Sequence, residues 1–126
     1  MPNNKKILII EDDKDLAKIY AESFQIDGFE TKSAYDGKEG LKVALEFHPD
    51  LILLDIMLPL MSGLEVLKAL KSDPLTGKIP VILLTNVSDE SVIIQGFQEA
   101  ADGYIIKATS SPSQIKEEVK TFLSAK

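Results

Sequence analysis

The sequence contains no cysteine among its 126 residues. It therefore forms neither disulfides nor thiolate metal sites, which is typical of cytoplasmic proteins, and we expect a cytoplasmic location. It also lacks an apolar run long enough to cross a membrane, and its N-terminus does not resemble a signal peptide. Basic residues are fewer than acidic ones, 14 against 20, and the net charge of −6 argues against nucleic-acid binding through a basic face.

What the sequence does have is the composition of an ordinary globular domain, with 44% apolar and 27% charged residues. A chain of this length can bury a proper core as a single domain. No internal repeat, low-complexity tract or interdomain linker interrupts it. We therefore predict one domain over residues 1–126.

The stretch Asp50–Gly63, DLILLDIMLPLMSG, combines a buried-strand pattern with a carboxylate. Four consecutive apolar residues at 51–54 favour a strand covered on both faces, as in a parallel sheet flanked by helices. This strand ends on Asp55, and Pro59 signals a loop after it. Ligands bind at the carboxyl ends of such strands. Asp55 is thus a candidate site residue, although an aspartate after a strand is more often a turn former or a helix cap.

The rest of the chain alternates between strand and helix patterns. Further strands are predicted at residues 6–10, 29–34, 81–84 and 104–106, each followed by apolar residues at helical spacing. The side chains expected to cap helices are Asp13, Asp36, Ser62, Ser88 and Ser111. Five strands alternating with five helices indicate an α/β protein with a doubly wound, five-stranded parallel sheet, right-handed crossovers and helices on both faces.

Polar residues follow four of the predicted strands. Because parallel strands end at the same edge of a sheet, one edge should carry Glu11, Asp12, Asp55, Thr85 and Lys107. Converging carboxylates repel one another unless a cation lies among them, and oxygen ligands without cysteine or a nearby histidine favour Mg²⁺. A magnesium ion, a hydroxyl and an ammonium can together hold a phosphoryl group. The remaining carboxylate can then act as the nucleophile, because aspartyl phosphate is an established covalent intermediate.

The motifs IIEDD, LLDIMLPLMSG, VILLT and GYIIK, in this order and at these separations, resemble the receiver domain of two-component response regulators over essentially the whole chain. The resemblance implies a flavodoxin-like (βα)5 fold with strand order 2-1-3-4-5. It implies a receiver over residues 1–126 without an output domain. Such a phosphoprotein takes a phosphoryl group from a histidine kinase or a histidine phosphotransfer protein. It promotes its own phosphorylation and dephosphorylation but turns over no external substrate.

The family's pattern makes Asp55 the phosphoacceptor and assigns the metal ligands. Asp12 and Asp55 would bind Mg²⁺ directly, Glu11 would bind it through water, and the backbone carbonyl of Met57 would add a further ligand. Mn²⁺ is an alternative ion at such a site.

The same pattern assigns the switch. Lys107 would contact the phosphoryl oxygens, and Thr85 would hydrogen-bond to one of them and move toward the site. Tyr104 would change rotamer as Thr85 moves, altering the surface of the fourth helix, fifth strand and fifth helix. That surface would bind a downstream protein or an output domain. The expected assembly is a monomer or a weak, phosphorylation-dependent dimer, with no contact to membranes.

Two positions depart from the family's pattern. Ala108 follows Lys107 where the family usually has proline after a cis peptide bond, and a trans bond would alter the reach of the lysine. Asn86 stands where a smaller residue is common. We expect Asn86, with Met57 and Val87, to limit attacking water and so to lengthen the phosphoryl lifetime.

Three alternative functions compete with this interpretation. A receiver fold could serve as a protein-binding scaffold that needs no phosphorylation. A phosphatase with an aspartyl nucleophile often places a general acid two residues later, where this chain has Met57. A flavin-binding module needs a phosphate loop after the first strand, where this chain has the acidic sequence EDDKD.

Overall fold

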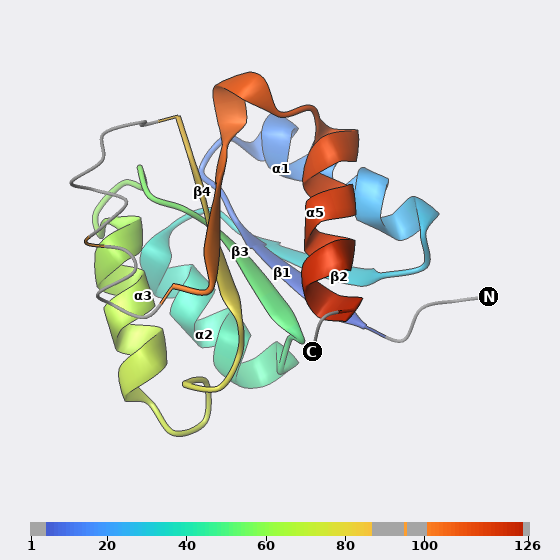
Figure 1. Ribbon diagram of the computed structural model, residues 1–126. Coiled ribbons are helices and arrows are strands. Elements are labelled where there is room, and N and C mark those ends of the chain that lie inside the picture. The colour runs from blue at the N-terminus through green and yellow to red at the C-terminus, as the bar shows by residue number, and fades with distance from the viewer. Residues whose placement is uncertain (1–4, 87–94, 96–100, 125–126) are drawn as a thin grey trace.

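A computed structural model describes residues 5–86, 95 and 101–124 of the chain (Figure 1). Its sheet has five parallel strands in the order β2-β1-β3-β4-β5. The strands are β1 (Lys6–Ile10), β2 (Glu30–Ala34), β3 (Leu51–Asp55), β4 (Val81–Thr85) and β5 (Gly103–Ile106). The predicted fold class and strand order are confirmed.

Helices cover both faces of this sheet (Figure 1). Within the described residues they are α1 (Lys14–Ile26), α2 (Gly37–Phe47), α3 (Gly63–Ser72), α5 (Pro112–Ser124) and the short 3₁₀ helix η1 (Lys107–Thr109). α1 and α5 pack on one face, whereas α2 and α3 pack on the other. The helix predicted to begin after Ser88 lies outside the described residues.

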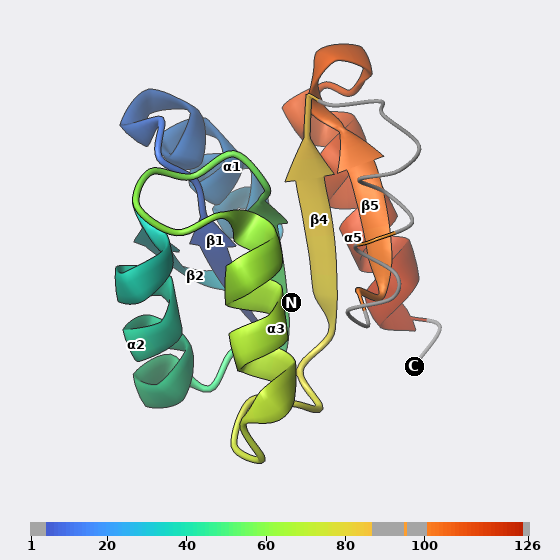
Figure 2. The same cartoon turned by 90° about the vertical axis from the view of Figure 1, so that its left-hand side faces the viewer.

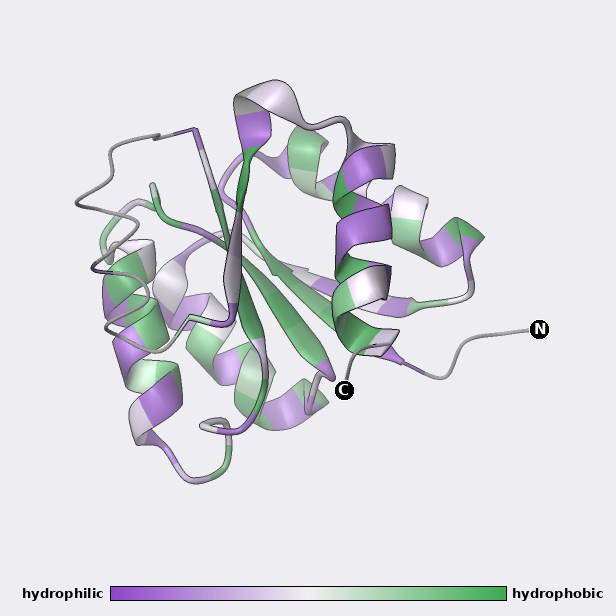
Figure 3. Cartoon of the chain, viewed as in Figure 1, coloured by the Kyte–Doolittle hydropathy of each residue, from purple (hydrophilic) through white to green (hydrophobic). Residues whose placement is uncertain are grey.

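The apolar core forms two layers, one on each side of the sheet. Alternate residues of β1 and β3 point to opposite layers, so Ile7 packs toward α1 and α5 while Leu8 packs toward α2 and α3. Figure 3 shows the hydrophobic colour concentrated on the central strands. Burial on both faces explains the uninterrupted apolar runs. β2 instead alternates between exposed and less exposed residues, as expected for the edge strand.

Four of the predicted helix caps are formed. In each, the cap's side-chain oxygen accepts a hydrogen bond from the backbone N–H of the third residue after it. The caps are Asp13 of α1, Asp36 of α2, Ser62 of α3 and Ser111 of α5. The chain's own short polar side chains therefore begin these helices, while Ser88 lies outside the described residues.

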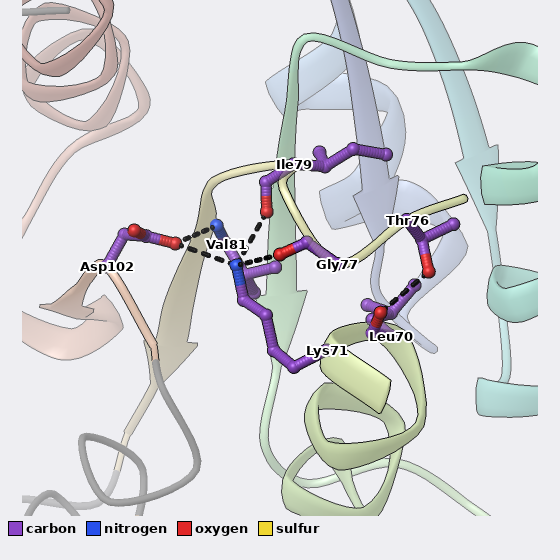
Figure 4. A network of polar contacts seen from close by, with 7 residues as sticks. All are labelled: Leu70, Lys71, Thr76, Gly77, Ile79, Val81 and Asp102. Atoms are coloured by element: carbon purple, nitrogen blue, oxygen red, sulfur yellow. Dashed lines mark hydrogen bonds and ion pairs between the residues drawn. The ribbon is translucent and has the colours of Figure 1, made fainter. Parts of the chain in front are cut away.

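A polar network joins the end of α3 to the beginnings of β4 and β5 (Figure 4). Lys71 Nζ donates to Ile79 O at 2.8 Å, to Asp102 Oδ2 at 3.2 Å and to Gly77 O at 3.4 Å. Asp102 Oδ2 also accepts from Val81 N–H at 2.8 Å. The network fixes the N-terminal ends of the strands, at the opposite edge of the sheet from the candidate site. Among the described residues, no helix has the length and apolar composition needed to cross a membrane.

Candidate functional site

The predicted polar residues gather at the carboxyl edge of the sheet. Asp55 is the last residue of β3 and Thr85 the last of β4, while Glu11 and Lys107 directly follow β1 and β5. The Glu11 and Asp55 side chains are only 1% and 3% exposed, and Thr85 is fully buried. Asp12, the next residue along from Glu11, is exposed. Two buried acids and one exposed acid therefore lie at this edge.

Lys107 joins the two buried acids. Its Nζ donates to Asp55 Oδ2 at 2.9 Å and forms an ion pair with Glu11 Oε1. No cis peptide bond occurs among the described residues, so the bond from Lys107 to Ala108 is trans. The lysine contacts both acids although a trans peptide bond and an alanine follow it, at the point where β5 gives way to η1.

Backbone N–H groups fix the orientation of both carboxylates. Asp55 Oδ1 accepts from Met57 N–H at 3.0 Å, and Glu11 Oε2 accepts from Asp13 N–H at 3.0 Å. In each acid one oxygen is thus held by the chain two residues ahead, and the other faces Lys107. The backbone N–H of Glu11 also donates to Ala34 O at 3.0 Å, which holds this residue beside the end of β2.

Gly63, the first residue of α3, permits the loop after Asp55 to close tightly. Its N–H donates to Ile56 O at 2.8 Å. A Cβ at this position would overlap Asp55 O and would lie 2.5 Å from Ile56 Cα. Only glycine therefore lets α3 begin against the backbone of the candidate phosphoacceptor. The sequence marks Gly63 as a loop signal but does not reveal this contact.

The electrostatics of the site follow from its burial. Burial raises the pKa of Glu11 from 4.5 to about 7, with a further upward contribution from the Asp55 charge, although Lys107 and the N–H of Asp13 act against this shift. Burial alone would lower the pKa of Lys107, but its contacts with Glu11 and Asp55 outweigh this effect and raise it. The ammonium therefore stays charged between the two acids.

The carboxylates are placed to share a cation. Glu11, Asp12 and Asp55 each offer an oxygen, and these oxygens lie within 4.8 Å of one another. An all-oxygen set with one exposed member suits a hard ion that keeps part of its water shell, as Mg²⁺ does. The predicted ligand Met57 lies next to this cluster through its N–H contact with Asp55, and its side chain is 65% exposed.

Thr85 and Tyr104 lie on the same face of the sheet. Tyr104 is paired with Leu83, two residues before Thr85 on β4, and successive side chains alternate between faces. Leu83 belongs to the layer beneath α2 and α3, so all three side chains point to that side. Tyr104 is partly exposed, whereas Thr85 is buried.

Sequence reasoning missed one polar group near the site. Tyr20 of α1 is buried, and burial raises the pKa of its hydroxyl. Lys107 lowers this pKa, whereas Glu11 and Asp55 raise it, so the phenol lies within the electrostatic reach of the site. Helical spacing marks Tyr20 as a core residue, but nothing in the sequence distinguishes it from the other apolar residues of the helix.

Comparison with known proteins gives a consistent result. Residues 7–120 match the family described as the response regulator receiver domain. The polar-differentiation response regulator DivK of Brucella ovis is 43% identical over 122 residues, covering 94% of this chain and 96% of DivK. The DNA-binding dual master transcriptional regulator RpaA of a Synechocystis strain is 38% identical over 102 residues. That match covers 81% of this chain but only 42% of RpaA.

Solved structures share the fold over nearly the whole length. A CheY-like response regulator receiver domain protein from Methanospirillum hungatei superposes with a TM-score of 0.89 and 28% identity, covering 98% of this chain and 96% of that chain. The Mn²⁺-bound form of response regulator Rcp1 superposes with a TM-score of 0.82 and 27% identity, covering 94% of this chain and 93% of that chain.

Proposed function

This chain belongs to the response regulator receiver family of two-component signalling, and we propose on that basis that Asp55 is its phosphoacceptor. The observation that carries the proposal is the contact of Lys107 with the buried Asp55 carboxylate at the carboxyl end of β3. Asp55 Oδ1 is held by Met57 N–H, while Oδ2 faces the ammonium. A nucleophile and a cation for the incoming phosphoryl oxygens are thereby already in contact.

The proposed donor is a phosphohistidine of a histidine kinase or a phosphotransfer protein. An Asp55 carboxylate oxygen forms a bond to phosphorus as the phosphorus–nitrogen bond breaks. The electron pair of that bond passes to the imidazole, which takes up a proton. Lys107 then contacts the transferred oxygens, and the Thr85 hydroxyl moves toward the site and hydrogen-bonds to one of them, so that two donors stabilise the negative charge.

Mg²⁺, or Mn²⁺ in its place, is the proposed cofactor. When bound, such an ion neutralises charge on the transferring phosphoryl group. Glu11, Asp12 and Asp55 supply the carboxylate oxygens, with the Met57 carbonyl as the further proposed ligand. The clustering of the three acids supports this assignment, as does the Mn²⁺-bound form of the related Rcp1.

The proposed output is a change in the surface around β5. Thr85 moves toward the phosphoryl group, and Tyr104, on the same face of the sheet, changes rotamer in response. The surface made by β5, α5 and the helix predicted after Ser88 then binds a downstream protein or output domain. That last helix lies outside the described residues, so the support for this step comes from Thr85, Tyr104 and the family.

Intact-mass measurement tests the phosphoacceptor. The chain is incubated with acetyl phosphate and Mg²⁺, beside an Asp55→Asn variant, a sample with chelator, and Asp15→Asn as a control at an exposed aspartate. We expect one added phosphoryl group in the wild type and in the control, and none in the other two samples. No gain from acetyl phosphate or from any histidine kinase would instead favour the phosphorylation-independent scaffold.

A further inference from the structure

Leu60 occupies an unusual place in the loop between β3 and α3. Its φ of 68° lies in the left-handed region, and its side chain is 96% exposed. Met61 N–H donates to Pro59 O at 2.7 Å across it, which is the hydrogen bond of a γ-turn. With this positive φ the turn is of the classic form, which is rare and strained.

The Leu60 side chain stays outside the apolar packing of the described residues. Leu58 and Met61, on either side, pack against the apolar layer beneath α2 and α3, whereas Leu60 projects into solvent. A leucine Cβ is disfavoured at positive φ, where glycine or asparagine is easier to accommodate. Leu60 therefore combines a left-handed backbone, which belongs to the γ-turn of this loop, with an apolar side chain exposed to contact from another molecule.

The position of this loop indicates which kind of molecule the Leu60 side chain contacts. The loop leaves the sheet directly at Asp55 and arches at the carboxyl edge of the strands (Figure 2). Met57, whose N–H holds Asp55 Oδ1, also exposes an apolar side chain there. Because Asp55 is only 3% exposed, a protein that brings a phosphorus atom into bonding distance must press against this loop.

We infer that Leu60, with Met57 beside it, is a specificity-determining contact for a protein phosphodonor, seated in an apolar recess next to the donor's phosphohistidine. This inference rests on the proposed function. A small donor such as acetyl phosphate reaches Asp55 without covering the loop and should not sense Leu60.

The test compares two kinds of donor on four proteins. The proteins are the wild type, Leu60→Asn, Leu60→Met and Leu75→Asn; Leu75 is a matched control, 71% exposed in the loop after α3 and remote from Asp55. The donors are acetyl phosphate and the autophosphorylated cores of every histidine kinase encoded in the same genome. The kinase that phosphorylates the wild type fastest is then used for all variants.

We expect Leu60→Asn to slow phosphotransfer from that kinase by about ten- to a hundredfold, the effect of losing one buried leucine contact. Leu60→Met should restore most of the rate, and Leu75→Asn should match the wild type. All four proteins should react equally with acetyl phosphate. Leu60→Asn should also melt no lower than the wild type, because asparagine suits the left-handed backbone and no packing is lost.

Several outcomes would overturn the inference. One is an unchanged rate of phosphotransfer from the kinase to Leu60→Asn, and another is an equal loss of rate with the kinase and with acetyl phosphate. A third is a lower melting temperature of Leu60→Asn, which would show that Leu60 has a role inside the molecule. Phosphorylation of the wild type by acetyl phosphate but by no kinase would overturn it while leaving the phosphoacceptor intact. Phosphorylation by neither donor would remove the proposed function itself. If sedimentation shows that Leu60→Asn only disrupts self-association, the occupant is a second copy of the chain and the inference fails.

Discussion

Replacing Lys107 by methionine should destabilise the protein through the two acids that it joins. The substitution keeps an unbranched apolar stem but removes the ammonium that contacts Asp55 Oδ2 at 2.9 Å and pairs with Glu11. Both carboxylates are almost fully buried, so water replaces the ammonium poorly. They would then face each other without a compensating charge.

The size of this effect follows from burial. Removing one partner of a buried ion pair costs about 3–5 kcal/mol. The Lys107 side chain is 12% exposed, and water at this rim should keep the loss near the lower end, at about 3 kcal/mol. For a domain of this length, that corresponds to a fall in melting temperature of roughly 10 °C.

Magnesium should partly reverse the loss. In the wild type a cation competes with the Lys107 ammonium for the oxygens of Glu11 and Asp55, whereas in Lys107→Met it does not. Mg²⁺ should therefore bind the variant more tightly and raise its melting temperature more. At a hundredfold excess over the dissociation constant, the gain is about 2.7 kcal/mol.

The assay is thermal unfolding followed by circular dichroism, first in chelator and then over a series of Mg²⁺ concentrations. Lys120→Met is the control, because Lys120 pairs with Asp27 far from the site and should show the wild-type response to Mg²⁺. The reasoning is refuted if Lys107→Met equals the wild type in chelator. It is also refuted if Mg²⁺ shifts the variant no more than the wild type.

Three further predictions concern other parts of the molecule. Gly63→Ala should lower the free energy of unfolding by about 1–3 kcal/mol and slow phosphorylation by acetyl phosphate, because the new Cβ displaces the Asp55 backbone. Denaturant unfolding measures the first effect and intact mass measures the second. Lys71→Met should lower the free energy of unfolding, measured in urea, by about 2 kcal/mol but leave the phosphorylation rate unchanged. The control Lys68→Met, at an exposed position on the same helix, should leave the free energy of unfolding almost unchanged. In chelator, wild-type stability should fall as pH rises from 4.5 to 7, because folded Glu11, with its raised pKa, holds its proton more tightly than the unfolded chain; a flat profile would contradict the burial effect.

The fold was largely readable from the sequence because its signals are local. Apolar runs such as residues 51–54 can only be buried on both faces, and caps such as Asp36 and Ser62 act within one helical turn. Alternation of strands and helices then requires a parallel sheet, which places Glu11 and Asp55 at one edge. The order of the strands came from resemblance to the family, since no local pattern encodes it.

Tertiary structure decided which side chains meet and which are buried. Glu11 and Asp12 are adjacent acids in the connection between β1 and α1, yet Glu11 is buried and Asp12 is exposed. Contact of Lys107 with both acids depends on the register of three strand pairs, from β1 across β3 and β4 to β5, and on the turn into η1, which no single segment specifies. The left-handed backbone of Leu60 likewise contradicts its own preference, because the loop must close over a fixed span between β3 and α3. Sequence thus determined the elements and the chemistry at their ends, whereas the packing of distant segments determined the geometry of the site.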